Sequence, residues 1–192
     1  MSASDDRGLT DETFPSALVA AQAGAGWAWN ALMAEMGDAL HAYVRRQGAR
    51  DADDLVGETW LHVARGIGSF DGSYTQFRSW VFMVAHHRII DERRRTRRKP
   101  SHPADTRTLE VVASAEPSAE SEAIEALGEE EVVRILATLP EAQREVMLLR
   151  IVAGFGITEI AEIVGKRPGA VQALQHRAVN RLRGAVERSG WN

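Results

Sequence analysis

The sequence predicts an all-α protein made of two small helical domains joined by a flexible linker, with a helix-turn-helix in the C-terminal domain. Apolar residues recur at spacings of three and four over most of the 192 residues. Residues 101–122 interrupt this pattern with Pro, Ser, Ala and scattered acids, as a linker does. Residues 157–182 fit two short helices around a glycine turn.

The predicted helix-turn-helix runs from Ile157 to Leu182. Thr158 is expected to cap the first helix, and Gly165 to end it in the left-handed conformation. Pro168 suits the first turn of the second helix, because the N–H it lacks would be unpaired there. The second helix is expected to have about 14 residues and to be roughly 20 Å long, which fits a DNA major groove.

The second helix has two different faces. Its inward positions are Val171, Leu174, Ala178 and Leu182. Its outward positions are Gln172, Gln175, His176, Arg177 and Arg181. A helical hairpin with an ordinary solvated face is the alternative interpretation. Outward side chains that can read base edges favour DNA binding instead.

Charge is segregated along the chain, although the net charge is only −4. Residues 86–100 hold seven basic and two acidic side chains, and residues 132–192 hold nine and five. Residues 1–85 and 101–131 are acidic, with net charges of −5 and −8. Local fields govern the encounter with phosphate, because salt screens charges beyond about 8–10 Å. The absence of Cys excludes disulfides and zinc fingers.

The N-terminal half begins with a polar tail, residues 1–13, that is expected to be disordered. A helical pattern follows over 14–48, and Gly24 and Gly26 are expected to divide it into two helices. The next amphipathic segment, Asp51–Ile67, crowds acids into its first turns, which suits the positive helix terminus. A docking face for a basic partner is the sharper interpretation of the same acids.

A polar loop, Ser69–Gln76, precedes a long helix predicted over Phe77–Arg98. Six arginines and a lysine lie within residues 88–99, after the aromatic Trp80 and Phe82. A solvated helix end is one interpretation. Nucleic-acid binding is favoured, because cations hold phosphate and aromatic faces stack on unpaired bases. Phe77 is equally suited to closing the domain core.

Together these segments resemble an RNA polymerase sigma factor of the sigma-70 family, and more narrowly its extracytoplasmic-function (ECF) group. The resemblance covers residues 25–99 and 124–186. Asp51–Trp60 resembles the segment that docks on the polymerase clamp helices, and Phe77–Arg95 the helix that melts and holds the −10 element. Leu139–Arg150 resembles the first part of the −35-binding domain, and Pro168–Ala178 its recognition helix.

This resemblance implies an alternative sigma factor that binds core RNA polymerase and directs promoter recognition and melting, with no catalysis and no cofactor. The implied domains are 14–100, which binds core polymerase and the −10 element, and 123–192, which binds the −35 element. The implied partners are the clamp helices of the β′ subunit, the flap of the β subunit and promoter DNA, with an anti-sigma factor as a candidate regulator. The expected location is the cytoplasm, without membrane insertion.

The resemblance also implies three sets of site residues, and none of them is catalytic or metal-binding. The polymerase-binding set is Asp51, Asp53, Asp54, Leu55, Glu58 and Thr59. The −10 set is Ser73, Tyr74, Thr75, Gln76, Phe77, Trp80, His87, Arg88, Arg93 and Arg94. The −35 set is Gln172, Ala173, Gln175, His176, Arg177 and Arg181. Tyr74 is expected to stack on a flipped base, with polar loop neighbours bonding its edge.

The chain departs from the family pattern at two places. Gly57 stands where Gln is usual, and His86 and His87 stand where Arg and Asn are common. The histidines raise a first rival, a metal-dependent hydrolase site made of His62, His86, His87 and Asp91. Adjacent histidines project about 100° apart on a helix, however, and no phosphate loop or nucleophile motif accompanies them.

A conventional operator-binding regulator is the second rival. Such a protein should bind duplex DNA alone, whereas a sigma factor should need core polymerase.

Overall fold

The computed structural model describes residues 9–98 and 136–188, and within these ranges it contains helices and no strands. The all-α prediction is therefore confirmed. The predicted linker and the start of the next predicted helix lie outside the described residues. The N-terminal half contains α1 (Phe14–Gln22), α2 (Gly26–Arg46), α3 (Ala52–Gly66), the 3-10 turn η1 (Ile67–Ser69) and α4 (Tyr74–Arg98). The C-terminal half contains α7 (Glu141–Ile151), α8 (Ile157–Ile163) and α9 (Pro168–Arg188).

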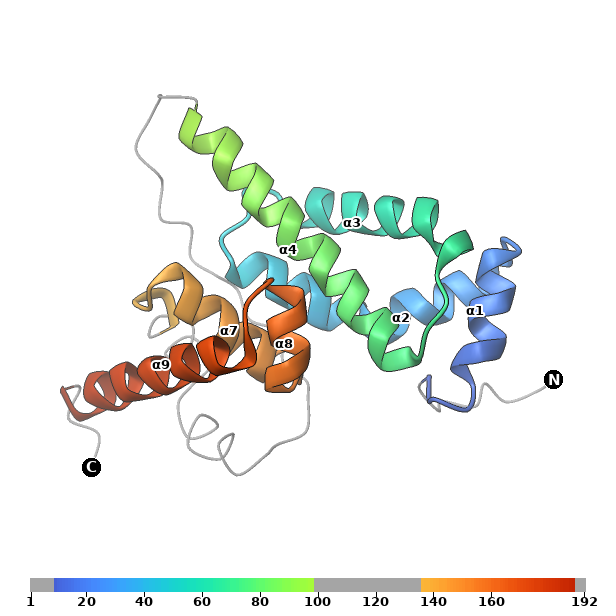
Figure 1. Cartoon of the computed structure of the whole chain (residues 1–192). Helices are drawn as coiled ribbons and strands as arrows, with labels where there is room; N and C mark the ends of the chain where they lie inside the picture. The colour runs from blue at the N-terminus through green and yellow to red at the C-terminus, as the bar shows by residue number, and fades with distance from the viewer. Residues whose placement is uncertain (1–8, 99–135, 189–192) are drawn as a thin grey trace.

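The N-terminal half is built around the long helix α4, with α2 and α3 packed beside it (Figure 1). Apolar side chains from these helices are fully buried between them, including Leu32, Leu40, Val63 and Val81. The predicted division near residues 24–26 is confirmed, because α1 ends at Gln22 and α2 begins at Gly26. Gly24 lies between them with φ +81°, a conformation that glycine adopts at no steric cost.

Of the tail predicted for residues 1–13, the structure describes residues 9–13, and the rest lies outside the described residues. The backbone N–H of Leu9 donates to the Glu35 carboxylate at 3.0 Å, and Thr13 N–H donates to the Thr10 carbonyl at 3.1 Å. These bonds tie Leu9 to α2 and place Thr10–Thr13 in a turn before α1.

Helix α4 begins at Tyr74, three residues earlier than the sequence pattern predicted. The side chains of Ser73 and Gln76 explain the early start. Ser73 N–H donates to Gln76 Oε1 at 2.8 Å, and Gln76 N–H donates to Ser73 Oγ at 3.3 Å. This reciprocal capping box satisfies two N–H groups that a helix start leaves unpaired.

The helix-turn-helix is confirmed as α8 and α9, with one cap reassigned. Gly156, not Thr158, precedes α8, and its N–H donates to the Glu159 carboxylate at 2.7 Å. Gly165 follows α8 with φ +64°, as predicted. Helix α9 has 21 residues, so it is longer than predicted and spans about 31 Å.

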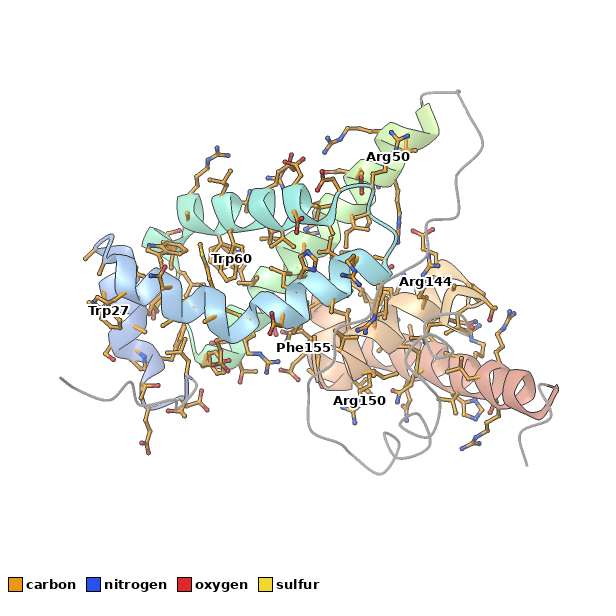
Figure 2. The ribbon with its side chains drawn as sticks, turned by 180° about the vertical axis from the view of Figure 1, so that it is seen from behind. Trp27, Arg50, Trp60, Arg144, Arg150 and Phe155 are labelled. Carbon is orange, nitrogen blue, oxygen red and sulfur yellow. The ribbon has the colours of Figure 1, made fainter. Side chains whose placement is uncertain are left out.

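The two halves pack against each other: α8 contacts α4, and α7 contacts α2 (Figure 1). Their buried apolar residues form one continuous cluster. Phe82 of α4 and Phe155, in the turn before α8, lie edge to face with ring centroids 5.0 Å apart. Figure 2 shows Phe155 where the halves meet, and Trp27 at the far end of the N-terminal half.

Candidate nucleic-acid and protein interfaces

Helix α9 presents the side chains predicted to read DNA. Val171 and Ala178 are fully buried against α7 and α8, as the pattern predicted. This orientation leaves one face of α9 in solvent, and the exposed members of the −35 set there are Gln172, Ala173, His176, Arg177 and Arg181. Gln175 is half-buried at the edge of this face.

Two side chains of this face make bonds along the helix. Arg177 Nε donates to the Ala173 carbonyl at 3.1 Å, and His176 Nδ1 lies 3.5 Å from the Asn180 amide nitrogen. The guanidinium Nη atoms of Arg177 have no bond within the described residues, so they can pair with a base edge or a phosphate.

The loop before α4 is compact around Gly72. A Cβ at this position would lie 2.9 Å from Gln76 Oε1 and 2.9 Å from the Phe70 ring. A side chain at this position would therefore displace Gln76 or Phe70 and disturb the capping box. In this conformation Ser73 and Gln76, although exposed, bond each other's backbone, and Thr75 is exposed beside them.

Tyr74 is half-buried, and contacts from three elements orient it. Its hydroxyl donates to Glu35 Oε1 at 3.0 Å, and its ring lies 5.6 Å from that of Phe14. The Arg78 guanidinium lies 5.8 Å from the centre of the ring. Burial and the Glu35 carboxylate raise the pKa of Tyr74, so its hydroxyl remains a donor at neutral pH.

The two other aromatic residues of the −10 set have different exposures. Phe77 is fully buried, in ring contact with Phe14, Phe70 and Trp80. Here it closes the N-terminal core and has no face for a base. Trp80 is partly exposed and stacks on Phe70, with centroids 5.3 Å apart and planes 12° apart.

The charged residues of the −10 set point in several directions. Arg88 lies beside α3, with Nη1 3.6 Å from a Glu58 carboxylate oxygen. Arg94 is largely exposed and His87 is exposed on α4. Arg93 instead pairs with Glu141 of α7 at 2.5 Å and is only 19% exposed. The structure therefore turns Arg93 toward the C-terminal half, away from the exposed charged residues of the set.

The polymerase-binding set divides into surface and core residues. Asp51 caps α3 by accepting the Asp54 N–H at 3.0 Å, and it is exposed together with Asp53 and Asp54. Leu55 and Thr59 are buried, so they position the helix and have no surface to offer a partner.

Leu61 is a surface residue of α3 that the sequence pattern did not single out. It is 58% exposed and lies one to two turns after Asp54 and Gly57 on the same face. The sequence could have indicated this residue, because Leu61 is apolar but lies outside the apolar periodicity of the helix. Its spacing from Asp54 places it on the same face as the acids.

The four residues of the hydrolase rival do not converge. His86 turns to Glu145 of the C-terminal half, and His62 lies 3.2 Å from an Arg88 nitrogen. Across residues 9–98 and 136–188, no group of three or more His, Cys, Asp or Glu side chains is placed to hold a metal ion. In the same ranges, no helix has the length and apolar character needed to cross a membrane.

The chain is similar to known protein families and relatives. The sigma-70 region 2 family matches residues 32–99, and the sigma-70 region 4 family matches residues 129–182. The ECF RNA polymerase sigma factor SigD of Mycobacterium tuberculosis is 33% identical over 147 residues, which is 77% of this chain and 68% of SigD. The chain belongs to the ECF group of sigma-70 family RNA polymerase sigma factors.

Solved structures share the fold of this sigma factor. CnrH in complex with the cytosolic domain of CnrY aligns with a TM-score of 0.64 and 22% identity, covering 90% of this chain and 96% of CnrH. The sigma factor RpoE of Bartonella quintana, in complex with the anti-sigma factor NepR, aligns with a TM-score of 0.61 and 20% identity, over 92% of this chain and 98% of RpoE. The matched region 2 covers α3, α4 and most of α2, and the matched region 4 covers α7, α8 and most of α9.

Several side chains that shape these surfaces were missed by sequence reasoning. Glu35 orients Tyr74, and Arg78 donates to the Ala153 carbonyl at 2.6 Å. Tyr43 and Glu145 bond each other across the two halves. Each contact spans at least 39 residues, so no local pattern could have revealed it.

Proposed function

We propose that this sigma factor acts in the cytoplasm as a non-catalytic initiation factor that carries core RNA polymerase to its promoters. The observation that supports this most directly is the exposed face of α9, where Gln172, His176 and Arg177 stand in solvent on a helix-turn-helix. Gln and Arg pair with base edges in the major groove. In this proposal, that face reads the −35 element, and Arg181 contacts phosphate.

The −10 element is recognised at the start of α4. A flipped base stacks on the ring of Tyr74, whose hydroxyl is held by Glu35. Thr75 is exposed beside it for a base-edge bond, while Ser73 and Gln76 maintain the helix cap. Trp80, His87, Arg88 and Arg94 then contact the melted strand along α4.

Core polymerase docks on α3. The exposed acids Asp51, Asp53 and Asp54 attract a basic surface, and Leu61 supplies apolar contact on the same helix. The partner surface is the clamp helices of the β′ subunit, and the C-terminal half meets the flap of the β subunit. RpoE of B. quintana was solved with an anti-sigma factor, which supports an anti-sigma factor as the regulator here too.

Run-off transcription with purified core polymerase on a genomic DNA library tests the proposal. We expect transcripts from a discrete set of start sites that require both this chain and core polymerase, with a shared −35 and −10 sequence. The control is duplex DNA binding by the chain alone. Specific operator binding without polymerase, together with no run-off product, would support the operator-binding regulator instead.

A further inference from the structure

Helix α1 lies before the part of the chain that the sigma-70 region 2 family matches, which begins at residue 32. It packs against α2 and also contacts η1, the 3-10 turn that follows α3. Figure 1 shows α1 beside the connection that leads from α3 into α4. We call residues 67–73 of this connection the −10 loop, because the proposed function assigns −10 recognition to the start of α4 that follows it.

Gln22, the last residue of α1, bonds the −10 loop at two points. Its side-chain Nε2 donates to the Ile67 carbonyl at 2.9 Å and to the Phe70 carbonyl at 2.9 Å. An amide nitrogen carries two hydrogens, so these two bonds use its full donor capacity. Ile67 begins η1 and Phe70 follows it, at 45 and 48 residues from Gln22 in sequence. One side chain of α1 therefore fixes both ends of the turn.

The first residue of α1 contacts the other end of the −10 loop. Phe14 is fully buried, and its ring lies 5.6 Å from that of Tyr74 and 5.4 Å from that of Phe77. Phe70 in turn lies 5.3 Å from the Phe77 ring and stacks on Trp80. This cluster of rings joins α1, the loop and the first turns of α4. Helix α1 therefore supports the loop from Ile67 to the residue that the proposed function places against a base.

Other polar contacts of the −10 loop are local. Ser69 Oγ donates to the Gly66 carbonyl at 3.0 Å, and Ser73 and Gln76 cap α4. Local bonds of this kind fix the shape of a turn, whereas a bond from another element fixes where the turn lies. A site for an unpaired base needs its loop in place beforehand, because ordering a loop on binding costs conformational entropy. The bonds from α1 meet this cost when the chain folds.

We propose that α1 positions the −10 loop for promoter recognition, and that Gln22 is its positioning residue. The part played in recognition rests on the proposed function; the support of the loop by Gln22 does not. Without the two bonds, the loop shifts relative to Tyr74 and rejects incorrect bases less strongly. Binding to core polymerase is unaffected, because the docking acids lie at the opposite end of α3, a 15-residue helix about 22 Å long.

Gln22→Met tests this role, because Met has a length and a helix propensity similar to those of Gln and no hydrogen-bond donor. Gln22 is an exposed residue, so the change leaves the buried core intact. Val19→Met is the matched control. It introduces the same residue one turn earlier in α1, at a position that is 66% exposed. Both variants should keep the helix content of the parent chain.

Hydrogen exchange followed by mass spectrometry measures the support of the loop in the free, full-length chain. Peptides that cover residues 67–76 should exchange faster in Gln22→Met than in the parent, because the turn has lost its bonds to α1. Peptides from residues 79–90 of α4 should exchange alike in both. Val19→Met should match the parent throughout. Unchanged exchange of residues 67–76 in Gln22→Met would overturn the inference.

Transcription with core polymerase on promoters varied in the −10 element measures the consequence for recognition. Gln22→Met should reduce discrimination at the flipped base by about 5-fold or more, the value of one base-edge contact. The −35 preference and the affinity for core polymerase should stay unchanged. Unchanged −10 discrimination, or an equal loss in Val19→Met, would overturn the positioning role. Exchange needs no polymerase, so faster loop exchange in a chain that gives no run-off product would contradict only the proposed function.

Discussion

The hydroxyl of Tyr74 donates to the carboxylate of Glu35, 39 residues earlier in the chain, at 3.0 Å. The same carboxylate accepts the Leu9 N–H, so one side chain of α2 joins the N-terminal turn to the start of α4. Glu35 holds the hydroxyl, and the half-buried ring, which contacts Phe14 and Arg78, is the part of Tyr74 that we propose stacks on a base. Mutation can therefore separate the role of the Tyr74 ring from the role of the Tyr74 hydroxyl.

Tyr74→Ala should weaken promoter melting, and Tyr74→Phe should largely preserve it, because stacking needs the ring alone. Loss of base stacking costs about 1–3 kcal/mol, or about 5- to 150-fold in the open-complex equilibrium. A fluorescent adenine analogue in the −10 element would report melting. Equal losses in both variants would assign the effect to the hydroxyl and contradict the stacking role.

Gly72→Ala should disturb −10 recognition, because the new Cβ would meet Gln76 Oε1 and the Phe70 ring at 2.9 Å. Gly68→Ala is the matched control, since a Cβ there meets nothing within 4 Å. We expect a changed −10 preference in selected promoter variants for Gly72→Ala only, with −35 preference unchanged. If both variants transcribe like the parent, the shape of the loop does not matter for recognition.

Asp54→Arg should weaken the complex with core polymerase without unfolding the chain, because Asp54 is exposed. A disrupted interfacial charge pair costs about 2–5 kcal/mol. Asp38 is an exposed acid on α2, so Asp38→Arg is the control for charge reversal elsewhere on the surface. Affinity for core polymerase, measured by fluorescence anisotropy, should fall for Asp54→Arg alone; unchanged affinity would remove the acidic end of α3 from the docking surface.

Gln172→Ala and Arg181→Ala should have different effects on promoter binding: the first should change sequence preference, and the second should lower affinity for all sequences. Loss of a base-edge contact should cost about 1–3 kcal/mol at one promoter position and relax preference there. Loss of a phosphate contact should weaken all sequences alike and reduce the dependence of affinity on salt. Holoenzyme binding to a panel of −35 variants at several salt concentrations separates the two, and an identical uniform loss would refute the division.

Local pattern was sufficient for the helices and for the faces of α9. Val171 and Ala178 could be placed inside because apolar spacing reports which side of a helix meets a core. Gly165 could be placed in the turn because only glycine adopts φ +64° without strain. The start of α4 was misplaced because the capping pair Ser73 and Gln76 outweighed the apolar pattern that begins at Phe77.

What the sequence by itself determined was the all-α class, the helix-turn-helix and the segregation of basic and acidic segments. Only the tertiary structure decided that Phe77 closes the core, that Glu35 holds Tyr74, and that Arg93 pairs with Glu141. The reason is physical: helix periodicity depends on neighbours three or four residues away, whereas these contacts join residues far apart in sequence. Their partners are chosen by how whole helices pack, and α4 against α8 is a choice that no local spacing encodes.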